Sequence, residues 1–244
     1  MKRLEEGWFS FGGISNENMG LRLLEMPKRR KAKKRGNYQT ASGRDGDMWD
    51  SDDAYEAYDI TIKCESSDGY NEDDVRAWLD GENDLIFSDE PNLVYDALIR
   101  EYVDFASKYQ LFDTKLVTIS VHVQPFRRMI PPASLEPITT PATIINPGTA
   151  YSLPKITIRG NGDFSLHINT QRMDFTDISG GVVLDSELSD AFVLDEKFPE
   201  TVLCNDNVYG PFFRLVPGAN LITWVEEDGA NVESVTIEPR WRCL

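Results

Sequence analysis

Cysteine and histidine are scarce in this chain of 244 residues. The three cysteines, Cys64, Cys204 and Cys243, lie far apart and form no CxxC pair. An odd number of widely spaced cysteines argues against a disulfide framework and favours synthesis in a reducing cytosol. The two histidines, His122 and His167, belong to no HExxH or other metal-binding spacing. The sequence therefore predicts no metal site, and His122 is expected to be an ordinary histidine on the polar face of a strand.

Long apolar runs and catalytic motifs are also missing. No apolar run approaches the roughly 20 residues that a membrane-spanning helix needs, and the N-terminal MKRLEEGWFSFGG has no apolar signal core. We therefore expect no membrane insertion and no Sec-type export. GxSxG and GxxxxGK[ST] are absent, and Gly160-Asn161-Gly162 lacks the third glycine of a dinucleotide fingerprint. We expect no catalytic residues, no cofactor and no enzyme activity.

Positive charge is in short supply. The chain has 25 Lys and Arg against 41 Asp and Glu, which gives a formal net charge of −16 and a pI near 4.5. Such a balance argues against general nucleic-acid binding. The hydrophobic content of 41% is that of a soluble globular protein, and the length suits two domains of about 100 to 130 residues each.

Proline marks the boundary between these two domains. Because each proline fixes φ and removes a backbone donor, neither a helix nor a central strand is expected to run through a proline cluster. The cluster consists of Pro131, Pro132, Pro137, Pro141, Pro147 and Pro154. We predict an N-terminal β-rich domain at 1–130, a proline-rich linker at 131–146 and a C-terminal β-sandwich domain at 147–244.

Alternating residues dominate the first domain. Residues 58–64 and 116–124 alternate between apolar and polar side chains, which predicts half-buried strands. Asn71 precedes three acidic residues and caps a predicted short helix that Gly81 stops. Residues 93–105 fit either a helix or a strand.

The second domain shows only strand patterns. Residues 156–158 and 164–168 alternate around a glycine and asparagine turn at 160–163, which predicts a β-hairpin. Further strands are expected at 182–185, 191–194, 221–225 and 235–237. Strands separated by Gly, Pro and Asn turns, without a helical pattern, favour a β-sandwich.

A basic run interrupts the first domain. The run comprises Lys28, Arg29, Arg30, Lys31, Lys33, Lys34 and Arg35. A solvated loop or hairpin tip, a contact with an acidic protein surface and a contact with nucleic acid are three interpretations of it. No aromatic residue is interleaved for base stacking, which disfavours the last. We keep the run as a candidate protein-contact patch.

An acidic run follows the sequence Gly43-Arg44-Asp45-Gly46-Asp47. The alternating Asp45 and Asp47 suggest a calcium loop, but the EF-hand pattern requires glycine at its sixth position, where this chain has Asp50. A turn with solvated carboxylates is therefore the favoured interpretation of the run through Asp50, Asp52, Asp53 and Glu56.

An ordered series of short segments resembles a known family. FSFGGISNENMGLRLLEMPKRR, GRDGD, the WLDG helix and the DEPN turn resemble the N-terminal domain of distal tail proteins from long-tailed, non-contractile bacteriophages and related prophages. INPGTAYSLPKITIRGNGDFSLHIN, VVLDSE, FPETVL, PGANLITW and VTIEPRWR resemble the C-terminal domain of the same family. The segments cover most of the chain in the family's order.

This resemblance implies a structural virion protein. The N-terminal domain is expected to assemble into a hexameric ring, and the C-terminal domain is expected to be a galectin-like sandwich displayed outward. Such a ring sits at the distal end of the phage tail, after assembly in the host cytoplasm, and joins the tail tube protein to the tail-tip protein. DNA passes through its central channel without specific binding. If acidic residues line that channel they repel DNA, and Lys28 to Arg35 then lie away from the lumen, against an acidic neighbour.

Two other interpretations stay open. In the first, the C-terminal domain is a carbohydrate-binding module whose exposed aromatic residues, Tyr209, Phe212 or Trp224, hold a host cell-surface glycan. Packing of these three residues in a core or a turn is the simpler expectation. In the second, the chain is a hydrolase, which requires two carboxylates placed across a cleft.

Overall fold

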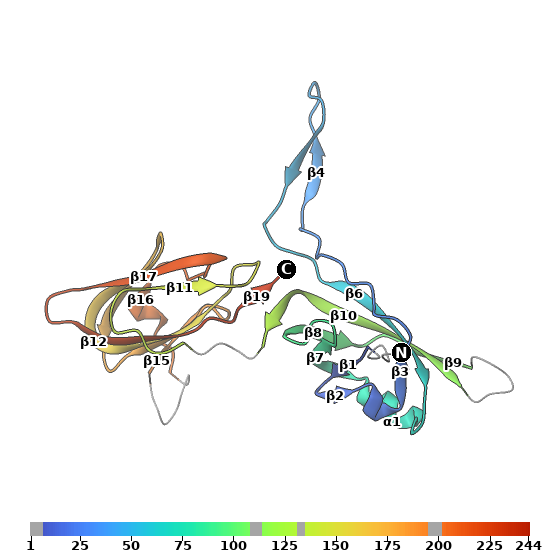
Figure 1. Ribbon diagram of the computed structural model, residues 1–244. Coiled ribbons are helices and arrows are strands. Elements are labelled where there is room, and N and C mark those ends of the chain that lie inside the picture. Colours follow the sequence, from blue (N-terminus) through green and yellow to red (C-terminus); the bar gives the residue numbers. More distant parts are fainter. Residues whose placement is uncertain (1–6, 108–113, 131–134, 195–201) are drawn as a thin grey trace. The chain divides into compact units, whose positions relative to one another are not determined.

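The computed structural model describes residues 7–107, 114–130, 135–194 and 202–244. The chain divides into two compact units, which we call unit 1 (residues 1–128 with Leu244) and unit 2 (residues 129–243). Both are built of strands, and one short α-helix is found in the described part of the chain (Figure 1). The expected mainly β fold is confirmed. None of the helices in the described ranges is long and apolar enough to cross a membrane.

Unit 1 is organised around one large antiparallel sheet with the strand order β2-β1-β7-β8-β10-β6-β3, and β9 pairs with β10 at its side. Its elements are β1 (Phe9–Phe11), β2 (Ile14–Ser15), the 3-10 helix η1 (Glu17–Met19), β3 (Leu21–Leu23), β4 (Asn37–Thr40), β5 (Asp47–Asp50), β6 (Tyr58–Ser66), α1 (Glu72–Trp78), β7 (Gly81–Phe87), β8 (Leu93–Ile99), β9 (Val103–Ser107) and β10 (Lys115–Met129).

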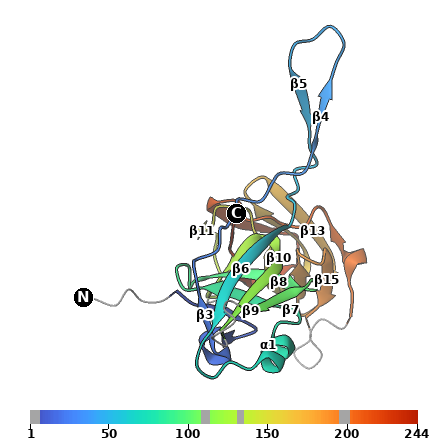
Figure 2. The same ribbon diagram turned by 90° about the vertical axis from the view of Figure 1, so that its right-hand side faces the viewer.

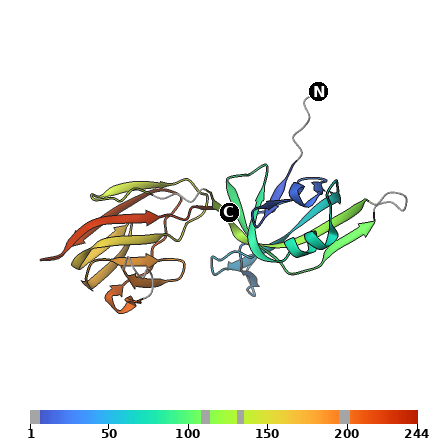
Figure 3. The ribbon, with the colours of Figure 1, turned by 90° about the horizontal axis from the view of Figure 1, so that it is seen from below.

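Helix α1 covers one face of this sheet (Figure 3). The helix begins as predicted, with the Asp73 N–H donating to Asn71 Oδ1 at 3.0 Å. Trp78 stacks on Phe9 with ring centroids 5.7 Å apart and donates from Nε1 to the Phe11 carbonyl at 2.8 Å. A seven-residue helix is too short to be stable alone, so its burial against the sheet holds it in place.

The segment that fitted either helix or strand is entirely extended. Residues 93–99 form β8 and residues 103–107 form β9. Tyr95, Ala97 and Ile99 alternate into the core of unit 1. This segment is therefore a strand and not a helix, as the burial of every second side chain shows. β8 lies between β7 and β10 in the sheet and pairs with both.

Unit 2 consists of two sheets that share the long strand β12. Its elements are β11 (Ala142–Asn146), β12 (Lys155–Ile168), β13 (Gln171–Ile178), β14 (Val182–Asp185), β15 (Asp190–Val193), the 3-10 helix η2 (Asn205–Asn207), β16 (Val208–Tyr209), β17 (Gly218–Glu226), β18 (Asn231–Glu238) and β19 (Arg242–Cys243). One sheet has the order β11-β17-β12-β13-β16, while β14 and β18 pair with the other part of β12. Side chains from both parts meet in a single core.

The hairpin predicted at 156–168 is wrong, because these residues form the single strand β12. The register shifts between Arg159 and Gly160 and again between Gly162 and Phe164. A Cβ on Gly160 would lie 2.4 Å from the Asn231 carbonyl oxygen, so glycine is needed for this close approach. The glycines thus let the strand bend and change partners, where the sequence pattern indicated a reversal of the chain.

The segment expected to be a linker is partly a strand. Residues 131–134 lie outside the described residues, but 142–146 form β11 and pair with β17 from Ala142 opposite Ile222 to Asn146 opposite Gly218. Pro141 and Pro147 flank this strand. Proline is compatible with such a place at an edge of a sheet, which explains how a proline-rich segment contributes a strand to unit 2.

Candidate assembly interface

A two-stranded hairpin, which we call the arm (residues 37–50), projects from unit 1 (Figure 1, Figure 2). Strand β4 pairs antiparallel with β5, from Asn37 opposite Asp50 to Thr40 opposite Asp47. Every residue of both strands is exposed. An isolated two-stranded hairpin is only marginally stable in water. The arm is therefore exposed and only weakly stable alone, as is typical of a segment that becomes ordered by binding a partner.

Tyr38 and Trp49 hold the strands of the arm together. Their ring centroids lie 4.8 Å apart and their planes are inclined by 57°, a tilted arrangement that aromatic pairs favour. A Cβ on Gly36 would lie 2.6 Å from Trp49 Cζ2, so glycine allows the indole to pack on the backbone. Tyr38 nevertheless remains 73% exposed and Trp49 41% exposed. Exposed aromatic residues of this kind are typical anchors of protein interfaces.

The neck of the arm pairs a basic segment with an acidic one. Backbone hydrogen bonds align residues 33–35 with residues 54–56: Arg35 N–H donates to the Ala54 carbonyl and Glu56 N–H donates to the Lys33 carbonyl, both at 2.8 Å. Three ion pairs follow this alignment, namely Lys33 Nζ to Glu56 Oε1 at 3.3 Å, Lys34 Nζ to Asp53 Oδ1 at 2.5 Å, and Arg35 Nη2 to Asp52 Oδ2 at 2.5 Å.

These ion pairs keep the neck charged and aligned. The hydrogen bond between Arg35 and Asp52 raises the pKa of Arg35 and lowers the pKa of Asp52. Asp53 in the same way raises the pKa of Lys34 through a side-chain hydrogen bond. Exposed pairs are screened by salt and individually add little stability. Their contribution is to fix the register in which the arm leaves unit 1.

The structure separates the basic run into two groups. Arg29, Lys33, Lys34 and Arg35 are paired with carboxylates of the same chain. Lys28, Arg30 and Lys31 have no ion pair among the described residues, and all three are exposed. The run itself is not the hairpin tip, which lies at residues 41–46. Its role as a protein-contact patch remains a prediction.

The carboxylates of Asp52, Asp53 and Glu56 are exposed to solvent, as expected, but they also pair with the basic run, which the sequence did not predict. Sequence reasoning treated the two runs separately and missed the arm. The available signal was their symmetry, since runs of opposite charge flank a glycine-containing turn at similar distances on each side. Antiparallel pairing across that turn brings opposite charges together.

A second group of charges lies at the start of the basic run. Arg29 forms ion pairs with Asp89 and with Glu90, whose Oε2 is 2.9 Å from Nη1, and its guanidinium lies 5.2 Å from the centroid of the Phe87 ring. Burial opposes the charge of Arg29, but the hydrogen bond and charge of Asp89 outweigh burial and raise the pKa. Arg127 reaches the same Glu90 at 2.9 Å from Nη1 to Oε1.

The sheet of unit 1 has an outer face, which we define as the side chains that alternate with its core residues. On β6 and β10 this face is polar, and His122 Nδ1 lies 2.7 Å from Asp59 Oδ1. His122 is thus on the polar face of a strand, as expected. The residues described by the structure include no group of three or more His, Cys, Asp or Glu side chains arranged to hold a metal ion.

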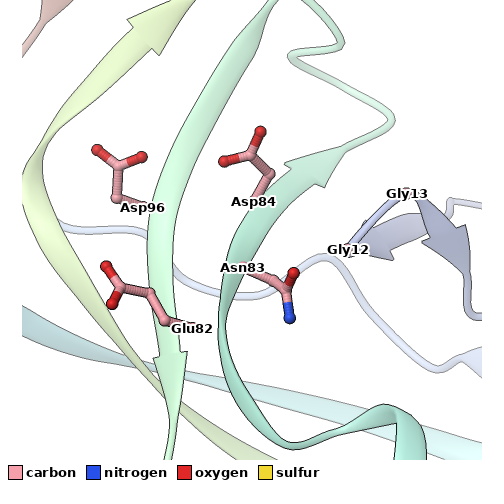
Figure 4. Close-up of a pocket in the computed structure, with 6 residues that line it drawn as sticks. All are labelled: Gly12, Gly13, Glu82, Asn83, Asp84 and Asp96. Carbon is pink, nitrogen blue, oxygen red and sulfur yellow. The ribbon is translucent and has the colours of Figure 1, made fainter.

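Carboxylates extend the outer face to β7 and β8. Glu82, Asp84 and Asp96 border an open pocket of about 420 Å³ beside the Gly12-Gly13 turn (Figure 4). Arg128 partly neutralises them, with Nε 2.7 Å from Asp96 Oδ1 and Nη2 2.5 Å from Asp84 Oδ1. The acidic side chains remain in excess on this part of the face.

The three aromatic residues considered for glycan binding differ in exposure. Tyr209 is 56% exposed on β16, opposite Asp174 of β13. Phe212 and Trp224 are partly buried and pack against the core of unit 2. Core packing therefore accounts for two of the three residues, and only Tyr209 offers an open ring.

Comparison with solved structures identifies a match over the length of the chain. A crystal structure of the Dit protein (gp 19.1) of phage SPP1 superposes with a TM-score of 0.67 and covers 95% of this chain and 96% of that chain, at 15% sequence identity. The chain shares its fold with SPP1 Dit. That protein is described as a paradigm of the hub adsorption apparatus in phages that infect Gram-positive bacteria. No family model matches the sequence, and no curated protein matches it either.

The match extends across both units, because it covers nearly all of each chain. The resemblance to distal tail proteins, which the sequence suggested through many short segments in order, is therefore confirmed at the level of the fold. At this sequence identity the similarity concerns the fold, and the role of the chain in an assembly is argued below from its own surfaces.

Proposed function

We propose that this chain is a non-enzymatic structural protein of a phage tail tip, and that six copies assemble into a ring. The observation that carries the proposal is the similarity in fold to SPP1 Dit over both units. Unit 1 forms the ring and unit 2 is displayed outward. The ring joins the tail tube protein to the tail-tip protein at the distal end of the tail, and it is assembled in the host cytoplasm.

The arm supports a ring in which each copy contacts the next. Its exposed strands and the exposed pair Tyr38 and Trp49 find no partner in the cores of their own chain. A contact between an arm and a different surface of a neighbour is heterologous, and repeated heterologous contacts close into a ring when the rotation permits. A projecting arm is therefore suited to a cyclic assembly.

The charges of unit 1 support a channel that does not retain DNA. The outer face carries Asp59, Glu82, Asp84 and Asp96. If this face lines the channel, its excess of carboxylates repels the phosphates of passing DNA, whereas a basic lining would retain DNA in a salt-dependent way. In-chain ion pairs occupy most of the basic run, which further reduces its attraction for DNA.

The mass of the protein in solution and negative-stain microscopy test this proposal. We expect a ring of about six subunits with a central opening, and we expect a variant in which a short Gly-Ser turn replaces residues 37–50 to be folded and monomeric. A wild-type chain that stays monomeric at high concentration contradicts the proposal. An arm-deleted chain that still forms the ring contradicts the role of the arm in assembly, while the ring itself stands.

Glycan binding by unit 2 is a second candidate function, and it is favoured by one observation, the exposed ring of Tyr209 beside Asp174. Here the aromatic ring is suited to stacking on a sugar, and the carboxylate is suited to accepting hydrogen bonds from the sugar's hydroxyl groups. A glycan array distinguishes the two functions. Binding that Tyr209→Ala abolishes supports the module, while an array without binding supports a purely structural role.

A further inference from the structure

Four of the seven cations of the basic run pair with carboxylates of the same chain, and among the described residues Lys28, Arg30 and Lys31 make no ion pair. Of these three, Arg30 and Lys31 are adjacent to each other, and both are exposed. Arg29 on one side of them and Lys33 on the other are both paired. Arg30 and Lys31 lie directly before the neck of the arm, at the end of the arm that is nearest to the body of unit 1.

A pocket of about 280 Å³ lies beside these two residues, and we call it the foot pocket. The foot pocket is lined by four cationic side chains and five further residues, namely Arg29, Arg30, Lys31 and Arg127 with Tyr58, Glu90, Tyr95, Pro125 and Leu244. Arg127 Nη2 donates to the carboxyl-terminal Leu244 oxygen at 2.9 Å. Burial raises the pKa of Tyr95 to about 12, so its hydroxyl adds no negative charge to the pocket even at alkaline pH. Arg29 and Arg127 already pair with carboxylates of the same chain. The positive charge that is left in the foot pocket is therefore that of Arg30 and Lys31, and it is suited to a carboxylate-bearing partner.

The opposite end of the arm has the complementary charge. The tip at residues 41–46 contains Asp45 and a single cation, Arg44, and Asp47 follows directly as the first residue of β5. Neither carboxylate makes an ion pair with any described residue, and both are exposed. Gly43 and Gly46, with φ of 80° and 79°, present them in a tight turn at the end of the hairpin.

The two ends of one arm do not meet within a chain. Ten residues separate Lys33 at the neck from Gly43 at the tip, and an extended chain of that length spans roughly 30 Å. The antiparallel ladders of the arm and the neck keep this length extended. The acidic tip therefore reaches a foot pocket only on another copy.

We propose that the foot pocket of each copy, with Arg30 and Lys31 at its rim, receives Asp45 and Asp47 from the arm tip of the adjacent copy. The inference rests on the proposed ring and identifies the surface that the arm contacts. The contact is heterologous, because tip and foot are different surfaces, and each copy both gives and receives an arm. Six steps of roughly 30 Å give a circumference of about 180 Å and a ring about 60 Å across at that radius, a size that leaves room for a channel.

Charge reversal provides the test. The foot variant carries Arg30→Glu and Lys31→Glu, and the tip variant carries Asp45→Lys and Asp47→Lys. Each places like charges in the contact, so we expect the concentration at which half of the chains are assembled to rise roughly tenfold or more. The control Glu227→Lys with Asp228→Lys changes the net charge as the tip variant does, but on unit 2, and should assemble like the wild type.

Combining the variants separates specific pairing from general charge effects. A chain with all four reversals regains complementary ends, and we expect its half-assembly concentration to return to within about threefold of the wild type. An equimolar mixture of foot and tip variants should also form rings, with the two kinds of chain alternating. Light scattering and negative-stain microscopy provide the readout.

The outcomes distinguish the two proposals. If either variant forms rings as the wild type does, or if the four-reversal chain and the mixture both stay dissociated, the tip-to-foot contact is overturned while the ring stands. If the wild-type chain itself forms no ring, both proposals fail. Assembly of the four-reversal chain also shows that the substitutions are compatible with folding.

Discussion

Tyr38 lies against Trp49 across the two strands of the arm, with ring centroids 4.8 Å apart, yet neither ring belongs to a hydrophobic core. An aromatic pair contributes about 0.5 to 1.5 kcal/mol, whereas ordering the backbone costs about 1 to 2 kcal/mol per residue. The aromatic pair therefore aligns the two strands, but its contribution is too small to offset the conformational entropy that is lost when the whole arm becomes ordered. Docking on another surface is the way for such a segment to become firmly ordered.

Replacing Trp49 should therefore impair assembly and leave the folded chain intact. We expect Trp49→Ala to shift the free energy of unfolding by less than about 0.5 kcal/mol, because the indole touches neither core. Trp78→Ala is the matched control, since Trp78 is buried and its loss should cost about 3 to 5 kcal/mol. Urea unfolding gives the stability and light scattering gives the mass. A Trp49 variant as unstable as the Trp78 variant would show that the arm is part of a core.

Most strands can be predicted from the sequence, because a half-buried strand alternates apolar residues, which face the core, with polar residues, which face solvent. Ile60, Ile62 and Cys64 are all buried in unit 1, and Asn71 caps α1 as its position suggests. The arm was beyond this approach. Its strands are exposed on both faces, so they carry no alternation. The ion pairs that align its neck join charges 17 to 23 residues apart in the sequence, such as Lys33 and Glu56.

The course of β12 shows a second limit. Glycine permits both a tight turn and a bulge within a strand, and the choice depends on which strands are available as partners. Gly160 lies against Asn231 of β18, which is about 70 residues away in the sequence. Local pattern alone does not contain that partner. The candidate interface and the bend therefore have the same cause, since long-range pairing determines both.

The bend in β12 is open to a direct test. We expect Gly160→Ala to destabilise the protein by about 2 kcal/mol, because its Cβ would lie 2.4 Å from the Asn231 carbonyl oxygen, and a backbone atom in a ladder yields little. Gly218→Ala serves as the comparison. That site is open around the Cβ, and its positive φ of 87° should cost about 1 kcal/mol. Equal losses of free energy in urea unfolding would show that the contact at Gly160 relaxes freely.

Cys64 should be inert while the protein is folded. Burial raises the pKa of its thiol to about 12, and its side chain is enclosed in the core of unit 1. At pH 8 only about one in ten thousand of such thiols is ionised. Mass spectrometry after brief alkylation should find Cys64 unmodified in the native protein and modified after unfolding in urea. Rapid alkylation of native Cys64 would indicate that unit 1 opens at this strand.

The pair of Arg240 and Asp185 links stability to pH. Arg240 Nη1 and Nη2 donate to Asp185 Oδ1 and Oδ2 at 2.8 and 2.7 Å. Burial of Asp185 opposes its ionisation, but these hydrogen bonds, together with backbone N–H groups of Leu188 and Glu187, outweigh burial and lower the pKa. The folded pKa thus lies below the unfolded value of about 3.9. The stabilisation is complete above that pH and is lost as the pH falls through the folded pKa.

Asp185→Asn should therefore reduce the free energy of unfolding by about 2 kcal/mol at neutral pH. The difference from the wild type should persist down to about pH 5 and shrink below about pH 4, as the wild-type carboxylate takes up its proton. Asp174→Asn is the control, because its ion pair with Arg172 is exposed and its loss should cost less than about 0.5 kcal/mol. Urea unfolding across this pH range provides the measurement. A difference that stays constant at low pH would mean that Asp185 acts through packing and hydrogen bonds that do not require its charge.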